Sequence, residues 1–220
     1  MSRLRVAVLA SGRGSNLQAL IAARDAGELP IDLVLVGSDK AKAGALQLAG
    51  DAGIPTFVLD PKAFASRRDF DVELFRRLDE SGADVLVLAG FMRILDGEVL
   101  KPWVGRMINI HPSLLPKYRG LHTHRRALEA GDAEHGASVH YVTAELDGGP
   151  VIAQALIGIR PGDDELQLAQ RLLTFEHQLL PAVLRLIAES RLSLLPPDVV
   201  VLDGNPRNGP LQLRNGHLVD

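Results

Sequence analysis

The sequence predicts an α/β fold of the single-domain, Rossmann-like kind: a mostly parallel sheet flanked by helices, with a later antiparallel portion. Short, nearly continuous apolar runs, typical of strands buried on both faces, recur through the first half. Longer segments of helical periodicity separate them, and this alternation favours right-handed βαβ units. The strand candidates are residues 6–10, 31–37, 56–59, 85–89 and 107–110.

Four helices are expected between these strands, at residues 17–26, 41–52, 66–81 and 98–104. After residue 110 the pattern changes. A loop rich in Pro, Gly and His is followed by a short helix and two strands around a polar loop. A long amphipathic helix comes next, which Pro181 should kink or restart. These elements are the loop 111–123, the helix 124–130, the strands 137–142 and 151–159 around the loop 143–150, and the helix 164–190. Turn signals in the tail, at Pro196-Pro197, Asp203-Gly204 and Asn215-Gly216, favour hairpins.

Composition excludes several classes of function. The 220 residues include no cysteine, which removes disulfides and thiolate metal sites. The net charge of −3 and the absence of a long basic run argue against nucleic acid as a partner. No apolar run is long enough to span a membrane, and the apolar stretch near the N-terminus is too short for a signal peptide. We therefore expect a cytoplasmic protein, a monomer or homodimer, that acts on small molecules.

A glycine-rich loop, Ser-Gly-Arg-Gly-Ser-Asn at residues 11–16, joins the first strand to the first helix. Glycine lets the backbone approach an anion, and the helix N-terminus supplies free N–H groups. Leu17 occupies the third glycine position of the dinucleotide fingerprint, and no Gly-Lys-Ser/Thr follows. The loop therefore fits a single phosphate group, or a tight turn without a ligand.

Asn109 and His111 lie two residues apart at the end of the fifth predicted strand, so their side chains share one face. Ligands of open parallel sheets bind at this carboxyl edge, and paired donors can stabilise an oxyanion. Asp147 lies in Asp-Gly-Gly, which is a turn signal. If Asp147 instead lies near His111, its charge should raise the pKa of the imidazole and orient the ring. Spacing alone leaves the turn and the catalytic interpretations open.

The remaining histidines point to no metal site. His122 and His124 form a His-Thr-His pair, but no further ligand has a recognisable spacing to it. His135 and His140 are interpreted as surface or loop residues. We expect no metal.

Five segments in this order resemble the phosphoribosylglycinamide formyltransferases, a family of folate-dependent enzymes of purine synthesis. They are Ser-Gly-Arg-Gly-Ser-Asn at 11–16, Ala-Gly-Phe-Met-Arg-Ile-Leu at 89–95, Asn-Ile-His-Pro-Ser-Leu-Leu-Pro at 109–116, Gly-Leu-His-Thr-His at 120–124 and Leu-Asp-Gly-Gly-Pro-Val-Ile at 146–152. The resemblance covers about residues 5–190. It implies a single formyltransferase domain over 1–220, with a phosphate-binding half (1–110), a catalytic and folate-loop half (111–190) and a C-terminal tail (191–220).

The resemblance also implies three groups of site residues. The catalytic residues would be Asn109, His111 and Asp147. The substrate phosphate and ribose would be bound by Gly14, Ser15, Asn16 and Glu176. The folate would be bound by Arg67, Met92, Arg93, Ile94, Leu95, Asn109, Thr143, Ala144, Glu145, Leu146 and Asp147. Ala144 stands where the family leads us to expect a polar or acidic residue.

The implied reaction is formyl transfer from 10-formyltetrahydrofolate, as co-substrate, to the amine of phosphoribosylglycinamide. Asn109 and protonated His111 would stabilise the oxyanion, with Asp147 keeping His111 charged. Two alternatives share these residues: methionyl-tRNA formyltransferase should carry a further RNA-binding domain, and formyltetrahydrofolate hydrolase an N-terminal regulatory domain. A non-catalytic phosphate-binding module would need only the loop at 11–16.

Overall fold

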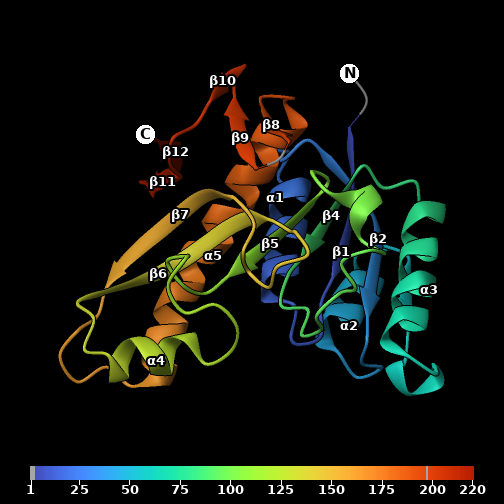
Figure 1. The fold of residues 1–220 in the computed structure, drawn as a ribbon, viewed down its shortest axis with the longest axis horizontal. Helices are drawn as coiled ribbons and strands as arrows, with labels where there is room; N and C mark the ends of the chain where they lie inside the picture. The colour runs from blue at the N-terminus through green and yellow to red at the C-terminus, as the bar shows by residue number, and fades with distance from the viewer. Residues whose placement is uncertain (1–2, 197) are drawn as a thin grey trace. The chain divides into compact units, whose positions relative to one another are not determined.

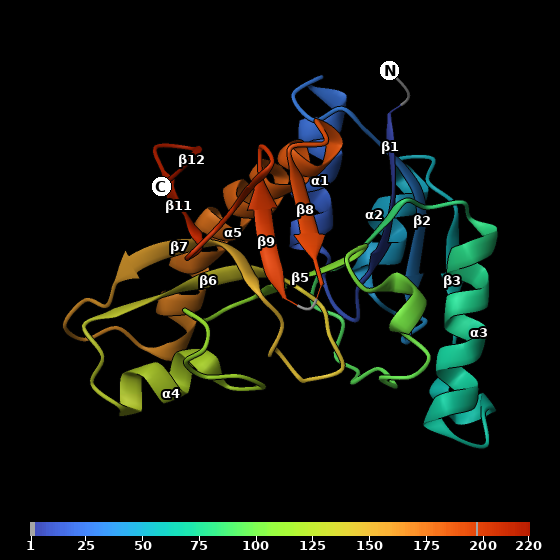
Figure 2. The same ribbon diagram turned by 45° about the horizontal axis from the view of Figure 1, so that its top comes forward.

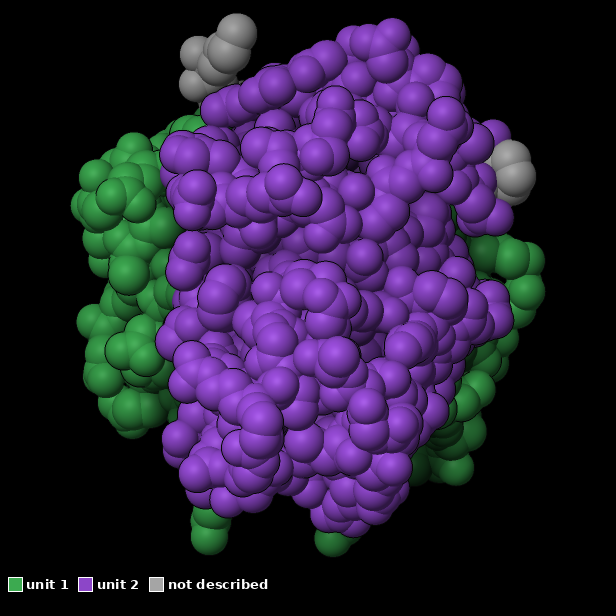
Figure 3. Space-filling model, turned by 90° about the vertical axis from the view of Figure 1, so that its left-hand side faces the viewer, with its two compact units in different colours: residues 1–109 green, residues 110–220 purple. Residues whose placement is uncertain are grey.

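The computed structural model describes residues 3–196 and 198–220, so Pro197 of the predicted Pro-Pro turn lies outside the described residues. The chain divides into two compact units, Met1–Asn109 and Ile110–Asp220 (Figure 3). Each unit is described by itself below.

The first unit contains the predicted parallel sheet, in the strand order β5-β4-β1-β2-β3 (Figure 1). Every pairing in this part is parallel, and β1 and β4 are buried along most of their length. This burial explains why the strands appear in the sequence as continuous apolar runs. The strands are β1 (Leu4–Leu9), β2 (Ile31–Ser38), β3 (Thr56–Val58), β4 (Val85–Leu88) and β5 (Met107–His111), of which β5 ends in the second unit.

Three α-helices connect these strands. Right-handed crossovers place α1 and α2 on one face of the sheet, where they contact each other. They place α3, which leads from β3 back to β4, on the other face. The helices are α1 (Ser15–Asp25), α2 (Gly44–Asp51) and α3 (Arg67–Glu80), and two short 3-10 helices are η1 (Pro61–Ala63) and η2 (Lys101–Trp103).

The second unit is built on the antiparallel hairpin of β6 (Glu134–Tyr141) and β7 (Val151–Gly158). β11 (Leu211–Arg214) pairs parallel to β7, and β12 (His217–Val219) pairs antiparallel to β11. A separate antiparallel sheet follows α5, and Figure 2 shows two of its strands, β8 and β9, side by side. Its strands are β8 (Leu192–Leu195), β9 (Val199–Leu202) and β10 (Asn205–Pro206). The antiparallel portion and the tail hairpins are thus confirmed.

Helix α5 (Glu165–Ala188) packs against β6 and β7, and α4 (Thr123–Glu129) packs against α5. Asp164 begins α5 with a capping box, in which it accepts the Gln167 N–H while the Gln167 side chain accepts the Asp164 N–H. None of the described helices combines the length and apolarity needed to cross a bilayer.

Two of the expected elements differ in the structure. The helix predicted at 98–104 is turns and the 3-10 helix η2, because Pro102 lacks an N–H and Trp103 must be buried, where its Nε1 donates to Asp79 at 3.1 Å. The predicted restart at Pro181 is also wrong. The helix runs through this residue, which is buried on the face that packs against the sheet.

The β6–β7 hairpin tolerates no side chain at Gly136. A Cβ there would lie 2.1 Å from the Ala155 carbonyl oxygen and 2.5 Å from Leu114 Cδ2, whereas a Cβ at Gly158 would meet nothing within 4 Å. Gly136→Ala should therefore destabilise the protein by roughly 2–3 kcal/mol and lower Tm by roughly 5–10 °C. Gly158→Ala, on the partner strand of the same hairpin, is the matched control and should change Tm by less than about 2 °C. Equal melting curves for the two variants would contradict this packing.

Candidate active site

The glycine-rich loop lies between β1 and α1 and is shaped by Gly14. Gly14 has φ 84° and is the N-cap residue of α1, without a side-chain cap. A Cβ at Gly14 would lie 2.7 Å from Ala45 Cα, so only glycine fits. Helix α1 has no acidic residue in its first turn, and Arg13 beside it is exposed. The backbone N–H groups at this end therefore meet no competing carboxylate from their own helix.

Ser11 connects this loop to the loop after β4, a role that the sequence alone did not reveal. Its hydroxyl donates to Asp39 Oδ1 at 2.6 Å and accepts the Met92 N–H at 2.9 Å. In the second loop, Met92 and Ile94 are exposed and Leu95 is buried. Two loops that the resemblance implies for different ligands are thus joined through one buried hydroxyl.

The loop after β4 is also held by α3. The guanidinium of Arg93 lies 4.6 Å from the centre of the Phe70 ring, and Asp71 accepts the Asp96 N–H at 2.7 Å. Arg67 is the first residue of the same helix. Helix α3 therefore carries one predicted folate contact and positions the loop that carries four others.

Strand β5 brings Asn109 and His111 to its carboxyl end. Asn109 pairs with Leu88 of β4 and is half-buried, and His111 is buried in the second unit. Both are on one face of the strand, as their spacing requires.

His111 and Asp147 meet in the structure. His111 Nδ1 lies 3.5 Å from Asp147 Oδ2, and His111 Nε2 lies 3.0 Å from the Tyr118 carbonyl oxygen. Both ring nitrogens therefore face oxygen acceptors. A neutral imidazole has one N–H and satisfies one of them, whereas an imidazolium satisfies both.

Asp147 has a second imidazole neighbour that the sequence did not suggest. His140 Nε2 lies 3.6 Å from Asp147 Oδ1, and His140 is 2 % exposed. The expectation of a surface or loop histidine is therefore wrong. Asp147 also accepts the Gly120 N–H at 2.9 Å, and its own φ is 46°. A carboxylate with two imidazole neighbours and a backbone donor has a fixed orientation.

Burial determines the charge of this cluster. It lowers the pKa of His111 below the ordinary value, and the Tyr118 carbonyl and the Asp147 charge oppose it without cancelling it. Burial alone would raise the pKa of Asp147, but His140, His111 and the Gly120 N–H together hold it below its usual range. The expected net upward shift at His111 is thus wrong, although Asp147 acts in the expected direction.

The lowered pKa of His111 favours a neutral ring, whereas the part that the charge of His111 plays in lowering the pKa of Asp147 requires a cationic ring. We assign a neutral His111 beside an ionised Asp147 at neutral pH, because the His111 side chain is only 8 % exposed. Binding of a group that needs a proton donor would have to supply the free energy that charges the ring.

A buried polar network fixes the segment that follows His111. Ser138 Oγ donates to the Ser113 carbonyl at 2.7 Å and accepts the Leu115 N–H at 3.0 Å. Gln154 Nε2 donates to the Leu115 carbonyl at 3.0 Å. Satisfied networks of this kind hold a single conformation. The hairpin thus determines where His111 and Tyr118 lie.

His124 and His135 also help to fix the segment that follows His111. His124 Nδ1 lies 3.0 Å from His135 Nε2, and His135 hydrogen-bonds to the backbone of Pro112. His135 is 1 % exposed, so its interpretation as a surface residue is also wrong. Burial lowers its pKa to about 4. Among the described residues, no group of three or more His, Cys, Asp or Glu side chains is arranged to hold a metal ion.

The loop 143–150 closes the β6–β7 hairpin. Arg119 forms an ion pair with Glu145, and the Gly148 N–H donates to the Glu145 carbonyl at 3.1 Å. Ala144, Glu145 and Leu146 are exposed, and Thr143 is half-buried. The loop is therefore both the hairpin turn and the element that places Asp147. Glu176 is buried on α5.

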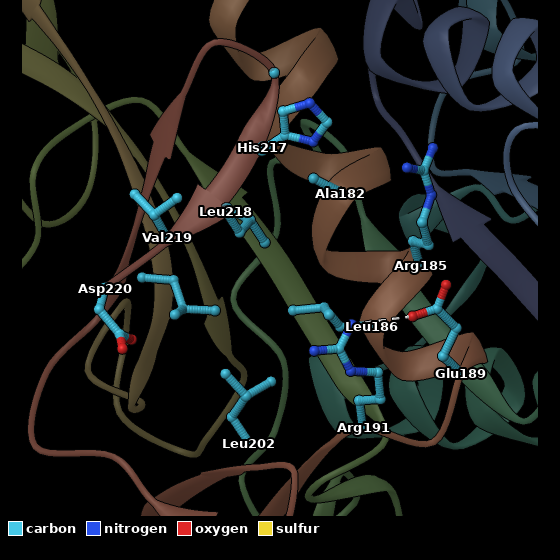
Figure 4. Close-up of a pocket in the computed structure, with 12 residues that line it drawn as sticks. Ala182, Arg185, Leu186, Glu189, Arg191, Leu202, His217, Leu218, Val219 and Asp220 are labelled. Carbon is cyan, nitrogen blue, oxygen red and sulfur yellow. Dashed lines mark hydrogen bonds and ion pairs between the residues drawn. The ribbon is translucent and has the colours of Figure 1, made fainter.

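A pocket of about 370 Å³ lies elsewhere in the second unit, where the end of α5 meets β12 (Figure 4). It contains none of the predicted site residues. Of the two arginines that line it, Arg185 and Arg191, the second is already paired with Glu189 at 3.4 Å and Asp203 at 2.8 Å. Nothing in this pocket matches the chemistry of the motifs.

Comparison with known proteins identifies the family. Residues 4–184 match the formyl transferase family. The phosphoribosylglycinamide formyltransferase of Escherichia coli K12 is 50 % identical over 191 residues, 87 % of this chain and 90 % of that protein. The trifunctional purine biosynthetic protein adenosine-3 of Drosophila pseudoobscura pseudoobscura is 51 % identical over 86 % of this chain, which spans only 14 % of that longer protein.

A solved structure agrees with these matches. The phosphoribosylglycinamide formyltransferase of Coxiella burnetii is 46 % identical and superimposes with a TM-score of 0.91, covering 96 % of this chain and all of that one. The fold and the sequence therefore indicate the same family. The chain belongs to the formyl transferase family, among the phosphoribosylglycinamide formyltransferases.

Proposed function

We propose that this protein transfers the formyl group of 10-formyltetrahydrofolate to the amine of 5-phosphoribosylglycinamide. The observation that carries this proposal is the buried pair of His111 and Asp147, 3.5 Å apart at the end of the strand that also carries Asn109. Family membership supplies the reaction class, and this pair supplies groups that can stabilise an oxyanion and move a proton.

In the proposed reaction the amine nitrogen attacks the formyl carbon, a new C–N bond forms, and the carbonyl electrons move to oxygen. Asn109 and His111 donate hydrogen bonds to this oxyanion. Collapse breaks the bond between the formyl carbon and N10 of the folate. The amine loses one proton and N10 gains one, and Asp147 assists this transfer.

His111 must exchange a partner to act as this donor, because both its ring nitrogens already face acceptors. The Tyr118 carbonyl is neutral and Asp147 is charged, and hydrogen bonds to charged acceptors are the stronger ones. We therefore assign the exchange to Nε2, with Nδ1 kept on Asp147. Charging the ring at this point stabilises the transition state more than the ground state.

The remaining assignments follow from the family resemblance. Gly14, Ser15 and Asn16 bind the phosphate through the N-terminus of α1, and Glu176 contacts the ribose. Met92, Arg93, Ile94, Leu95 and the loop 143–147 bind the pterin, and Arg67 the folate tail. The exposed apolar side chains of Met92 and Ile94 support an apolar contact with the ligand.

An acceptor assay tests the proposed function directly. The protein should formylate phosphoribosylglycinamide, should act poorly on the same glycinamide riboside without its phosphate, and should not act on methionyl-tRNA. Efficient formylation of methionyl-tRNA, or rapid hydrolysis of the formyl donor without an acceptor, would contradict the proposal. An equal rate with the unphosphorylated acceptor would contradict the phosphate assignment.

Replacement of Asp147 tests the catalytic pair. Asp147→Asn keeps the shape but removes the charge that favours a protonated His111, so kcat should fall on the order of a hundredfold, comparable to the loss of an oxyanion donor. Substrate affinities should change far less, because the pair acts chiefly in the transition state. The control is Glu189→Gln, which removes an exposed carboxylate of the same unit. Near-normal turnover in Asp147→Asn would show that Asp147 is only a turn residue.

A further inference from the structure

Asp71 is a fully buried carboxylate that the reaction does not use. It lies in the second turn of α3 and is 0 % exposed. Carboxylates are almost never fully buried unless they are paired, because burial removes their hydration. Burial, the largest influence, raises its pKa, and the Asp96 N–H and the charges of Arg67 and Arg93 oppose this without cancelling it, while Asp96 adds to the rise. Burying a carboxylate costs free energy, so we expect Asp71 to have a role that offsets this cost.

One oxygen of Asp71 binds the loop after β4. Oδ2 accepts the Asp96 N–H at 2.7 Å. Oδ1 has no hydrogen-bond partner among the described residues, and the Nε atom of nearby Arg93 is likewise buried without one. Among the described residues, Asp71 Oδ1 is thus an acceptor without a partner beside Asp96. Arg93 Nε is a donor without a partner at the start of the segment 93–96.

Two other residues of α3 hold the same segment. Arg68 Nη1 lies 3.4 Å from Asp96 Oδ1, and the ring of Phe70 lies under the Arg93 guanidinium. Asp96 Oδ1 in turn accepts the Glu98 N–H at 2.9 Å, which begins the next turn. Of these contacts, the ion pair with Arg68 is exposed and contributes little. The hydrogen bond that Asp71 accepts from the Asp96 N–H is the one that can fix the backbone.

We propose that Asp71 is a positioning residue for the formyl donor: it fixes the backbone of residues 92–96 in the conformation that binds the pterin. The proposal rests on the proposed function, since it assumes that this loop binds the folate. Because Arg67 is on the same helix, Asp71 also sets the distance between the contacts for the pterin and for the folate tail. Donor affinity should depend on Asp71, and acceptor affinity should not.

The test compares Asp71→Asn with Glu73→Gln by calorimetric titration with tetrahydrofolate and by steady-state kinetics. Asn keeps an acceptor for the Asp96 N–H but removes the charge and places an amide near Arg93. We expect the Kd for tetrahydrofolate and the KM for the donor to rise about tenfold, the effect of replacing the charged acceptor of this hydrogen bond by a neutral one. The kcat at saturating donor and the KM for the acceptor should stay within about twofold.

Glu73→Gln is the matched control, because Glu73 is on the same helix and its ion pairs within the described part of the chain are with Arg76 and Arg77. It should leave all of these constants unchanged. A lower Tm in Asp71→Asn with unchanged donor affinity would show a merely structural role and overturn the inference. Parallel losses of donor and acceptor affinity would overturn it as well.

A measurement on the unaltered protein covers the case in which Asp71→Asn does not fold. In hydrogen exchange followed by NMR, saturating tetrahydrofolate should slow exchange of the Asp96 amide at least about tenfold. An unchanged rate, with tetrahydrofolate bound, would overturn the inference while leaving the proposed function intact. Failure of the unaltered protein to bind tetrahydrofolate would instead remove the proposed function, and the inference with it.

Discussion

The burial of His111 against an ionised carboxylate is the constraint on which the chemistry depends. An imidazole in water at neutral pH is only about one quarter charged, because its pKa is about 6.5. In this protein burial favours the neutral ring, whereas the Tyr118 carbonyl and Asp147 favour the cation. Burial is the largest of these influences, so the pKa of the ring lies below its ordinary value and the ligand-free ring is neutral. A ligand that develops negative charge beside the ring favours its protonated form, and the attraction between the two charges offsets the cost of protonating the buried ring in the transition state.

Much of the second unit serves to maintain this balance. Tyr118 has φ 56°, and its hydroxyl donates to Asp132 at 2.8 Å, which fixes the residue whose carbonyl faces His111. The β6–β7 hairpin supplies His140 and Ser138 from one strand and Gln154 from the other. Its closing loop can place Asp147 only because residue 149 is glycine: a Cβ there would lie 2.0 Å from the Tyr141 carbonyl oxygen. The same residues of the hairpin therefore determine both its stability and the geometry of the site.

The sequence predicted those features whose cause is local. The parallel strands were identified because strands buried on both faces are continuously apolar, and the glycine loop because Gly14 precedes a helix start. Asn109 and His111 followed from strand periodicity. The contact between His111 and Asp147 joins residues that are 36 positions apart, so the motif suggested it and only the fold could place it.

The failures at the histidines have one physical origin, which is burial by distant parts of the chain. His135 and His140 are polar residues on a strand that is buried along nearly its whole length. An alternation of polar and apolar residues therefore could not indicate that their side chains are buried. Asp71 appears as an ordinary helix-surface acid until the segment ending at Asp96 covers it. The upward shift expected for His111 failed for the same reason, because local reasoning counts the neighbouring charge and not the lost hydration. Whether residues 1–220 behave as a single domain stays a prediction.

The most direct test of this account is the pKa of the His111 ring, measured by NMR titration of the ligand-free protein and of Asp147→Asn. The account predicts a pKa below the ordinary value of about 6.5 in the unaltered protein, because burial outweighs the carboxylate. It predicts a still lower value in Asp147→Asn, because the charge that opposes burial is lost. A His111 pKa at or above about 6.5 in the ligand-free protein, or one that does not move in Asp147→Asn, would contradict the account.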